Sequence, residues 1–330
     1  MSGAARDFAA VRRLMDESVG AVFPAAQLAV VDGGVTVLDE AVGACRPDTI
    51  FDVASLTKAL ATTTLAMRLV ARGTLSLDDE VRPGVPIRLL LCHAGGLPPW
   101  RPFYMTCAGQ PDERRAIVEA ARAEPLESEP GTKSAYSDLG FILLGDAIER
   151  AGGARLDEQW AALGVSGATY HPDPARCAPT EGELRGVVHD DNCRAMGGVA
   201  GHAGLFATAA DVSLVAAKLV GAWHGTGAGD ESLVEHEVIR RFWSPAGIAN
   251  STWCLGWDRP APKGSSAGTR WPATGVGHLG FTGCSLWIDP PGRRWVVLLS
   301  NRVYPTRANE AIKALRPRLH DAIVAALDGP

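Results

Sequence analysis

The pattern of apolar and polar positions changes along the chain and predicts the first layers of the fold. Residues 1–20 mix charges of both signs through apolar residues and are typical of an amphipathic helix. Residues 27–43 form two apolar runs around an Asp-Gly-Gly turn, which predicts an antiparallel hairpin. Residues 55–72 place large apolar side chains at helical spacing, and Gly73 is a typical residue after a helix end. The chain is therefore expected to begin with a helix, a hairpin and a buried helix.

The pattern becomes mainly helical in the middle of the chain and returns to strands near the end. Between about residues 75 and 205, short helical segments alternate with loops rich in proline and glycine. Thr208 and Asp211 fit a carboxylate variant of the capping box and predict a further helix. Residues 309–327 predict a closing helix that Pro317 should kink. Three segments before it are expected to be strands, namely 252–258, 275–289 and 293–303.

These elements predict an α+β fold, in which an antiparallel sheet flanked by helices is interrupted by an inserted, mostly helical lobe. We expect residues 1–74 and 205–330 to form the sheet domain and residues 75–204 to form the inserted helical domain. With 330 residues and 46% apolar content, the chain can bury a core in each. A cleft is expected where the two lobes meet, and Ser55 lies at that junction in the sequence.

The composition and charge of the sequence argue against several classes of binding partner. The net charge is -5 and no block of like charges occurs, which argues against a nucleic-acid groove or a membrane surface. The mixed charges of residues 1–20 exclude a continuous apolar core of a secretory signal, and no apolar run approaches the roughly 18 residues of a membrane span, so a cytoplasmic location is expected. Seven cysteines without a C-x-x-C pair favour scattered reduced thiols over a disulfide framework or a zinc site.

One pair of polar residues points to chemistry. The chain has five lysines against twenty-seven arginines, yet Lys58 lies three residues after Ser55, one helical turn away on the same face. A serine is a weak nucleophile until a base accepts its proton, and a lysine can do this where burial and neighbouring positive charge lower its pKa. Arginine does not lose its proton in proteins. A serine cap followed by an ordinary lysine would give the same spacing, so both interpretations stay open on this pattern alone.

A second serine, Ser266, satisfies the G-x-S-x-G pattern within residues 264–268. That motif depends on a strand that enters a strained turn and a helix that leaves it. Two prolines precede the segment and another follows, so neither element can adjoin it, and we expect a surface loop. Ser55 is therefore the better candidate for a nucleophile.

Two further segments accompany the first pair along the chain. Residues 136–138 read Tyr-Ser-Asp just before a predicted helix, and residues 278–280 read His-Leu-Gly on a late predicted strand. Together with Ser55 and Lys58, these segments resemble, in order and spacing, the active-site motifs of the serine β-lactamase and penicillin-binding-protein family, especially its class C and esterase-like branch. The connecting segments resemble that family as well, from about residue 27 to residue 305.

The resemblance implies a role for each matched residue. Ser55 matches the acyl-accepting nucleophile, Lys58 its activating base or proton relay, and Tyr136 the residue that passes protons to the leaving group and helps to activate water. A free phenol is a poor base at neutral pH, so Tyr136 needs a nearby positive charge, which Lys58 can supply. His278 replaces the lysine of many relatives and is expected to tune Tyr136 or to orient the substrate. The oxyanion hole would use the backbone amides of Ser55 and Phe281.

The remaining motif residues are implied to border the substrate, and they depart from the family. Asp138 replaces the usual asparagine and is either a helix cap or a substrate contact. Leu279, beside Gly280, replaces the usual threonine or serine. Because both that hydroxyl and the neighbouring lysine are absent, hydrolysis of esters or small amides is expected rather than of carboxylated lactams. Trp100 lies in an aromatic, proline-rich loop that either forms an apolar wall of the cleft or packs between the lobes.

The leading hypothesis is a serine hydrolase that forms an acyl-enzyme at Ser55, without cofactor or metal. Its partner would be a small ester, amide or lactam, and its oligomeric state is open. The alternatives are a β-lactamase or D-amino-acid peptidase or amidase, and a non-catalytic ligand-binding or sensor protein on the same fold. His189, Asp190 and Asp191 are metal-ligating types, but consecutive residues in a loop seldom converge on one ion, so we expect a polar loop beside the cleft.

Overall fold

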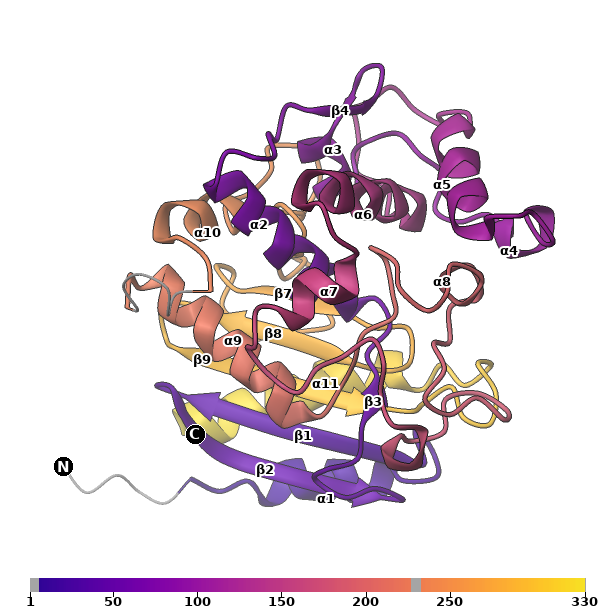
Figure 1. Ribbon diagram of the computed structural model, residues 1–330. Coiled ribbons are helices and arrows are strands. Elements are labelled where there is room, and N and C mark those ends of the chain that lie inside the picture. The colour runs from indigo at the N-terminus through magenta and orange to yellow at the C-terminus, as the bar shows by residue number, and fades with distance from the viewer. Residues whose placement is uncertain (1–5, 227–232, 330) are drawn as a thin grey trace.

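A five-stranded antiparallel sheet joins the two ends of the sequence in the computed structural model, which describes residues 6–226 and 233–329 (Figure 1). The strand order is β2-β1-β9-β8-β7. The strands are β1 (Ala25–Asp32), β2 (Val35–Gly43), β7 (Val276–Leu279), β8 (Ser285–Asp289) and β9 (Arg294–Ser300). The predicted hairpin is confirmed, since β1 and β2 pair around Gly33 and Gly34, which both have the positive φ angles of a tight hairpin turn. The β1–β9 pairing brings the late strands beside this hairpin.

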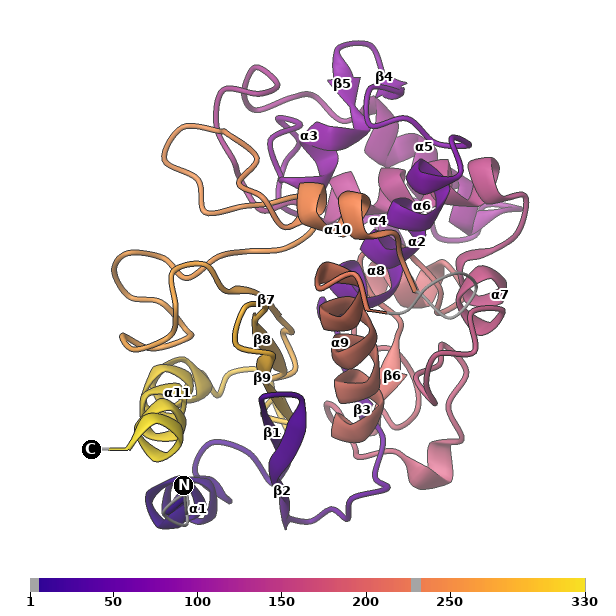
Figure 2. The same cartoon turned by 90° about the vertical axis from the view of Figure 1, so that its left-hand side faces the viewer.

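Helices cover both faces of the sheet, as Figure 2 shows. Helix α9 (Ala209–Trp223) lies on one face, while α1 (Ala9–Ser18) and α11 (Ile312–Asp328) lie together on the other. Successive side chains of a strand point to opposite faces, so Val297 of β9 enters the core beneath α9 and Val296 enters the core beneath α1 and α11. The predicted capping box at the start of α9 is present between Thr208 and Asp211.

A helical layer packs above the β7 edge of the sheet (Figure 1). Its elements are η1 (Lys58–Thr63), α2 (Thr64–Ala71), α3 (Ile87–Leu91), α4 (Phe103–Thr106), α5 (Glu113–Ala123), α6 (Asp138–Gly152), α7 (Leu156–Ala161), α8 (Asp191–Ala195) and α10 (His236–Phe242). Helix α6 packs against η1, α2, α3, α5 and α7. The short pieces are the ladders β3 (Phe51–Asp52) with β6 (Phe206–Ala207) and β4 (Glu80–Arg82) with β5 (Val85–Pro86), and the 3-10 turn η2 (Pro174–Arg176). The α+β fold is confirmed, whereas the proposed division at residues 75 and 205 stays a prediction.

Two of the expected strands differ from the structure. Residues 252–258 are not a strand. Leu255 donates to Phe242 and Gly256 donates to Leu91 in the helical layer, while Asp258 forms an isolated bridge to Gly277 of β7. Residues 275–289 form two strands, β7 and β8, separated by a tight turn at 280–284. That turn carries Phe281 to the end of the sheet that faces the helical layer.

Two simple features complete the fold. Each of the seven cysteines is a free thiol, and all but Cys45 are buried. Within residues 6–226 and 233–329, no helix is both long and apolar enough to cross a membrane.

Candidate active site

A strained turn presents Ser55 at the start of a helix. Asp52, at the end of β3, accepts hydrogen bonds from the backbone amides of Ala54 (2.8 Å) and His189 (2.7 Å). These bonds hold Ala54 at a φ of 48°, a left-handed conformation that is uncommon for a residue with a side chain. The chain then enters the helix directly after Ser55. Backbone strain at this point is typical of a functional site, and it gives the Ser55 side chain a fixed direction.

The helix that follows opens with an irregular turn. Lys58–Thr63 form a π-helical segment, and the Thr63 hydroxyl donates to the Lys58 carbonyl oxygen at 2.7 Å. All six residues are buried. Such π-helical turns occur frequently at functional sites. The spacing of apolar residues predicted an ordinary helix here, because a one-residue widening of a turn leaves no clear trace in that spacing.

Lys58 is fully buried, and its amine is surrounded by three acceptors. The nitrogen atom Nζ lies 2.9 Å from Ser55 Oγ, 2.8 Å from the His202 carbonyl oxygen and 2.7 Å from Asp138 Oδ1. An ammonium group has three N–H donors, whereas a neutral amine has two. The three contacts therefore match a protonated Lys58, with one proton directed at the oxygen of Ser55.

The pKa of Lys58 shifts in the direction opposite to the one required for a free lysine base. Burial favours a lower pKa, but the negative charge of Asp138 and the contact with Tyr136 outweigh it, so the pKa of Lys58 is raised above its usual value. The positive charge that was expected to lower it is absent, and a negative charge takes its place. Asp138 is not the helix cap either, because Ser137 caps α6 by accepting from the Gly140 amide. Asp138, the first residue of α6, instead forms an ion pair with Lys58 of η1.

Tyr136 completes the group around Ser55. Its phenol interacts with both Ser55 and Lys58, and Lys58 Nζ lies 5.1 Å from the centre of its ring. Burial raises the pKa of Tyr136, and the Lys58 cation opposes this shift without reversing it. Because Lys58 donates a proton to Ser55 Oγ, the serine's own proton must point to another acceptor, and the Tyr136 oxygen is in reach of it. The resting site thus contains a neutral phenol beside an ammonium group.

His93, which the sequence analysis did not single out, accepts hydrogen bonds from the residues directly before and after Tyr136. Its ring nitrogen Nδ1 accepts from the Ser137 amide at 3.1 Å, and its carbonyl oxygen accepts from the Ala135 amide at 2.8 Å. Its ring lies 4.5 Å from that of Tyr136, measured between centroids. His93 is buried and has a φ of 56°. The signal in the sequence was only an isolated histidine before two glycines.

His278 forms the opposite wall, at the edge strand β7. Its Nδ1 lies 2.8 Å from the Leu279 carbonyl oxygen, and because a carbonyl only accepts, Nδ1 carries the ring proton. Burial, assisted by the Lys58 cation, lowers the pKa of His278 to about 3. The ring is therefore neutral, and it does not replace the charge of the lysine that many relatives have here. Its Nε2 is a buried acceptor without a hydrogen-bond partner among the described residues.

The two amides expected to form an oxyanion hole are available. In the part of the chain that the structure describes, neither the Ser55 amide nor the Phe281 amide donates a hydrogen bond, and both residues line the same pocket. Gly280 makes this arrangement possible, because a Cβ atom there would lie 2.4 Å from the Val53 carbonyl oxygen. Only glycine lets the end of β7 approach the turn before Ser55 so closely.

A pocket of about 600 Å³ opens above Ser55. Trp100 is 40% exposed and lines it, which favours the cleft-wall interpretation of its loop. Asp138, Leu279 and Gly280 line it too. Trp253, which the sequence analysis missed, adds an aromatic surface with its ring centre 5.6 Å from that of His278. The pocket therefore combines an apolar, aromatic surface with charged side chains of both signs, and concave sites that mix apolar and polar groups are typical of small-molecule binding.

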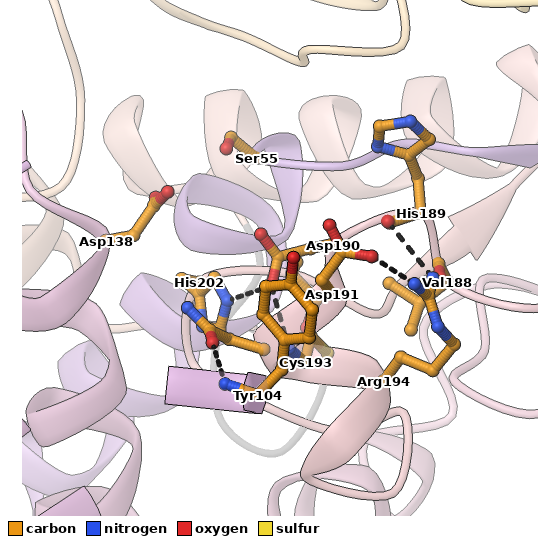
Figure 3. A network of polar contacts seen from close by, with 12 residues as sticks. Ser55, Tyr104, Asp138, Val188, His189, Asp190, Asp191, Cys193, Arg194 and His202 are labelled. Atoms are coloured by element: carbon orange, nitrogen blue, oxygen red, sulfur yellow. Dashed lines mark hydrogen bonds and ion pairs between the residues drawn. The ribbon is translucent and has the colours of Figure 1, made fainter. Parts of the chain in front are cut away.

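The acidic loop beside the pocket is organised by pairwise contacts. His189 bonds to Glu181 at 2.8 Å, Asp190 accepts from the buried His202 at 2.7 Å, and Asp191 pairs with Arg194. Figure 3 shows the His189 ring pointing away from the Asp190 and Asp191 carboxylates. Among the described residues, no group of three or more such side chains is arranged to hold a metal ion. The loop lines the pocket and connects to the Lys58 site through the His202 carbonyl.

Ser266 lies outside this arrangement. Residues 264–268 form turns and irregular structure, and the described chain has no strand directly before them and no helix directly after them. Ala267 is buried against the α11 side of the sheet, and the Thr269 amide donates to Asp321 of α11 at 2.7 Å. The G-x-S-x-G pattern thus belongs to a loop that packs on α11, away from the pocket.

The comparisons with known proteins agree with this geometry. The sequence matches the Beta-lactamase family over residues 10–319. A putative D-alanyl-D-alanine carboxypeptidase of Escherichia coli K12 is 28% identical over 88% of this chain and 81% of its own length. An N-acetylmuramyl-L-alanine amidase of Bacillus subtilis 168 is 29% identical over 88% and 80%. The solved structure of EstCE1, a hydrolase with promiscuous acyltransferase activity, has a TM-score of 0.73 at 20% identity and covers 95% of this chain and 97% of its own.

The chain therefore belongs to the Beta-lactamase family and is a serine hydrolase of that family. The resemblance stated from the three motifs is confirmed. The likeness to EstCE1, at 20% identity, establishes the fold alone.

Proposed function

We propose that the protein hydrolyses small esters or amides through an acyl-enzyme formed at Ser55. The observation that carries this proposal is the contact of Ser55 Oγ with a buried, charged Lys58 at 2.9 Å, beside two backbone amides that are free to bind an oxyanion. Lys58 stays protonated and stabilises the oxygen of Ser55 as it attacks. Tyr136 is the group that moves protons.

Acylation follows from these charges. Ser55 Oγ bonds to the substrate carbonyl carbon while its proton passes to the Tyr136 oxygen, and Tyr136 gives its own proton to the leaving alcohol or amine. The phenol therefore never accumulates as a phenolate, which suits its raised pKa. The oxyanion that forms accepts from the amides of Ser55 and Phe281. Deacylation runs these steps in reverse, with water in place of the leaving alcohol or amine. Water bonds to the acyl carbon while its proton passes to the Tyr136 oxygen, the bond between Ser55 Oγ and the acyl carbon breaks, and Tyr136 gives its own proton to Ser55 Oγ.

The third-motif residues beside Ser55 favour substrates without a carboxylate. The neutral His278 and the apolar Leu279 offer neither cation nor hydroxyl to a substrate carboxylate. The unpartnered Nε2 of His278 accepts a hydrogen bond from an N–H or O–H group of the substrate. The relatives named carboxypeptidase and amidase suggest peptide-like amides as the alternative, and β-lactam hydrolysis belongs to the same test. The cytoplasmic location predicted from the sequence, where no cell-wall peptide is met, is part of this proposal.

A substrate panel tests the proposal. Purified protein and the Ser55→Ala variant would be assayed on 4-nitrophenyl esters of increasing acyl length, aryl amides, D-alanyl dipeptides and a chromogenic cephalosporin. We expect turnover of the short esters that is lost in Ser55→Ala and retained in Ser266→Ala. Binding of these compounds without turnover by the unaltered protein would contradict the proposal and favour the sensor hypothesis.

A further inference from the structure

The turn that carries the Phe281 amide is held from behind by a buried arginine. Arg316, on α11, donates from Nη2 to the Gly280 carbonyl oxygen at 3.1 Å and to the Cys284 carbonyl oxygen at 2.6 Å. It is only 6% exposed. Among the described residues, no carboxylate lies within ion-pair distance of it, and its hydrogen bonds go to two carbonyl oxygens of this one turn.

The Gly280 carbonyl and the Phe281 amide belong to the same peptide group. A peptide group is planar and trans, so its C=O and N–H point in opposite directions. A donor that fixes the carbonyl toward Arg316 therefore fixes the N–H in the opposite direction, and Phe281 and Ser55 line the same pocket. A guanidinium on the carbonyl also polarises the peptide and makes its N–H a stronger donor.

The turn does not need Arg316 in order to satisfy its backbone. The Gly280 carbonyl also accepts from the Gly283 amide at 3.1 Å, and the Cys284 carbonyl also accepts from the Gly280 amide at 2.7 Å. Burial without a counter-charge is costly for a guanidinium, and it lowers the pKa of Arg316 to about 10. A buried cation that is not required for hydrogen bonding and is costly for stability fits a functional role better than a structural one.

We propose that Arg316 is a positioning residue for the oxyanion hole: bonded to the Gly280 carbonyl, it aims and polarises the Phe281 amide. This inference rests on the proposed function of Ser55. Arg302 supports the next peptide group in the same way, since its Nε donates to the Phe281 carbonyl oxygen at 2.8 Å. The geometry of the hole is thus fixed by side chains from outside the three motifs.

The test is the rate at which a fluorophosphonate modifies Ser55. In this reaction the bond between Ser55 Oγ and phosphorus forms, the phosphorus–fluorine bond breaks, and fluoride and the serine proton leave. The charge that develops on the phosphonyl oxygen uses the oxyanion hole. Saturation kinetics separate the chemical step from probe binding. The variants would be Arg316→Met and Arg316→Gln, and the matched control is Arg318→Met, which changes an exposed arginine on the same helix.

We expect Arg316→Met to slow the chemical step by roughly 10-fold to 100-fold, less than complete loss of one oxyanion donor. Probe binding and melting temperature should stay near those of the unaltered protein, and Arg318→Met should match it in all three. A 4-nitrophenyl ester should lose more rate than its thiono analogue, because sulfur depends less on the hole. If Arg316→Met does not fold, Arg316→Gln is judged by the same criteria.

Two results would overturn the inference. One is an unchanged chemical step in the folded variant. The other is a loss that is equal for the ester and its thiono analogue, which is the signature of general damage to the fold. If the unaltered protein is labelled at Ser55 and the variants behave in either way, only the role of Arg316 fails. If the unaltered protein is not labelled at Ser55, the proposed function fails with it.

Discussion

The two walls of the pocket differ in charge. On the helical side, Lys58 is a buried cation that donates to the Ser55 hydroxyl oxygen and the His202 carbonyl oxygen and forms an ion pair with Asp138. On the sheet side, His278 is equally buried, but it is neutral and its Nε2 has no hydrogen-bond partner in the described chain. Burial acts on both residues, and only Lys58 has a carboxylate beside it.

The difference teaches how one carboxylate decides the protonation of the site. Burial alone would discharge both groups, as it does His278. Asp138 reverses that outcome for Lys58 and keeps the ammonium group on the nucleophile. Of the residues matched to the three motifs, Lys58 is thus the charged donor near Ser55. His278 stays neutral, and its Nε2 can accept a hydrogen bond from the substrate.

Removing the charged wall should have the largest effect. Lys58→Met keeps most of the side-chain volume but removes the cation, so the oxygen of Ser55 loses its stabilising donor and Tyr136 loses its neighbouring charge. We expect kcat/KM to fall by roughly 10⁴-fold, the scale of a residue that acts on the nucleophile. Steady-state ester hydrolysis measures it. Lys218→Met, an exposed lysine on α9, is the control and should leave kcat/KM unchanged. A loss below 10-fold would contradict the charged role of Lys58.

Removing the proton carrier between the walls should come next. Tyr136→Phe keeps the ring beside His93 but removes the hydroxyl, and we expect kcat to fall by roughly 10²-fold to 10³-fold, the usual contribution of general acid-base catalysis. Tyr104→Phe, a tyrosine near Trp100, should have little effect. An equal loss in the two variants would mean that the phenol of Tyr136 has no special part in the reaction.

Removing the negative charge of Asp138, which keeps Lys58 protonated, should change the pH dependence of kcat/KM. Asp138 raises the pKa of Lys58, so the pKa of Lys58 is higher in the folded protein than in the unfolded chain. The stability that this ion pair contributes is fully present below the unfolded pKa of Lys58, and it is lost as the pH rises through the folded pKa of Lys58. Asp138→Asn should therefore move the alkaline decline of kcat/KM to lower pH. At neutral pH we expect roughly a 10-fold loss, since about 1.4 kcal/mol is tenfold in rate and a hydrogen bond to a charged group contributes about 1.5 kcal/mol.

A pH–rate profile from about pH 6 to about pH 11 measures this shift. Asp146→Asn, which alters an ion-paired aspartate on the same helix but outside the pocket, is the control. An alkaline decline that stays in place in Asp138→Asn would show that Lys58 does not depend on Asp138 for its proton.

Charging the neutral wall should have the smallest effect. His278→Lys introduces a cation at β7, and we expect it to lower KM for an ester that carries a carboxylate by roughly 5-fold, the effect of about 1 kcal/mol, while KM for a neutral ester is not improved. His278→Gln should leave the acid limb of the pH–rate profile in place above pH 5, because the pKa of His278 is about 3. Movement of that limb in His278→Gln would contradict a neutral His278.

Local spacing was enough for some of these features. Ser55 and Lys58 meet because residues three apart share a helix face, and Thr208 and Asp211 cap their helix for a similarly local reason. The Asp-Gly-Gly turn predicted the hairpin directly. In each case the partners lie within one turn of each other, so the sequence carries the contact.

Other features depend on contacts between distant segments, and local sequence patterns do not predict such contacts. Asp138 meets Lys58 only because α6 packs against η1. His93 contacts the Tyr136 segment from a loop whose conformation no local pattern predicts. The strand expected at 252–258 is absent because Leu255 and Gly256 donate to the helical layer, which leaves a single bridge from Asp258 to β7. Arg316 reaches the oxyanion turn from the last helix.

The most direct test of the central claim is to identify the serine that a fluorophosphonate modifies. The purified protein would be labelled to completion and mapped by peptide mass spectrometry, with Ser55→Ala and Ser266→Ala treated in parallel. The account predicts one adduct per chain on Ser55, absent in Ser55→Ala and unchanged in Ser266→Ala. An adduct on Ser266, or none on any serine, would contradict it.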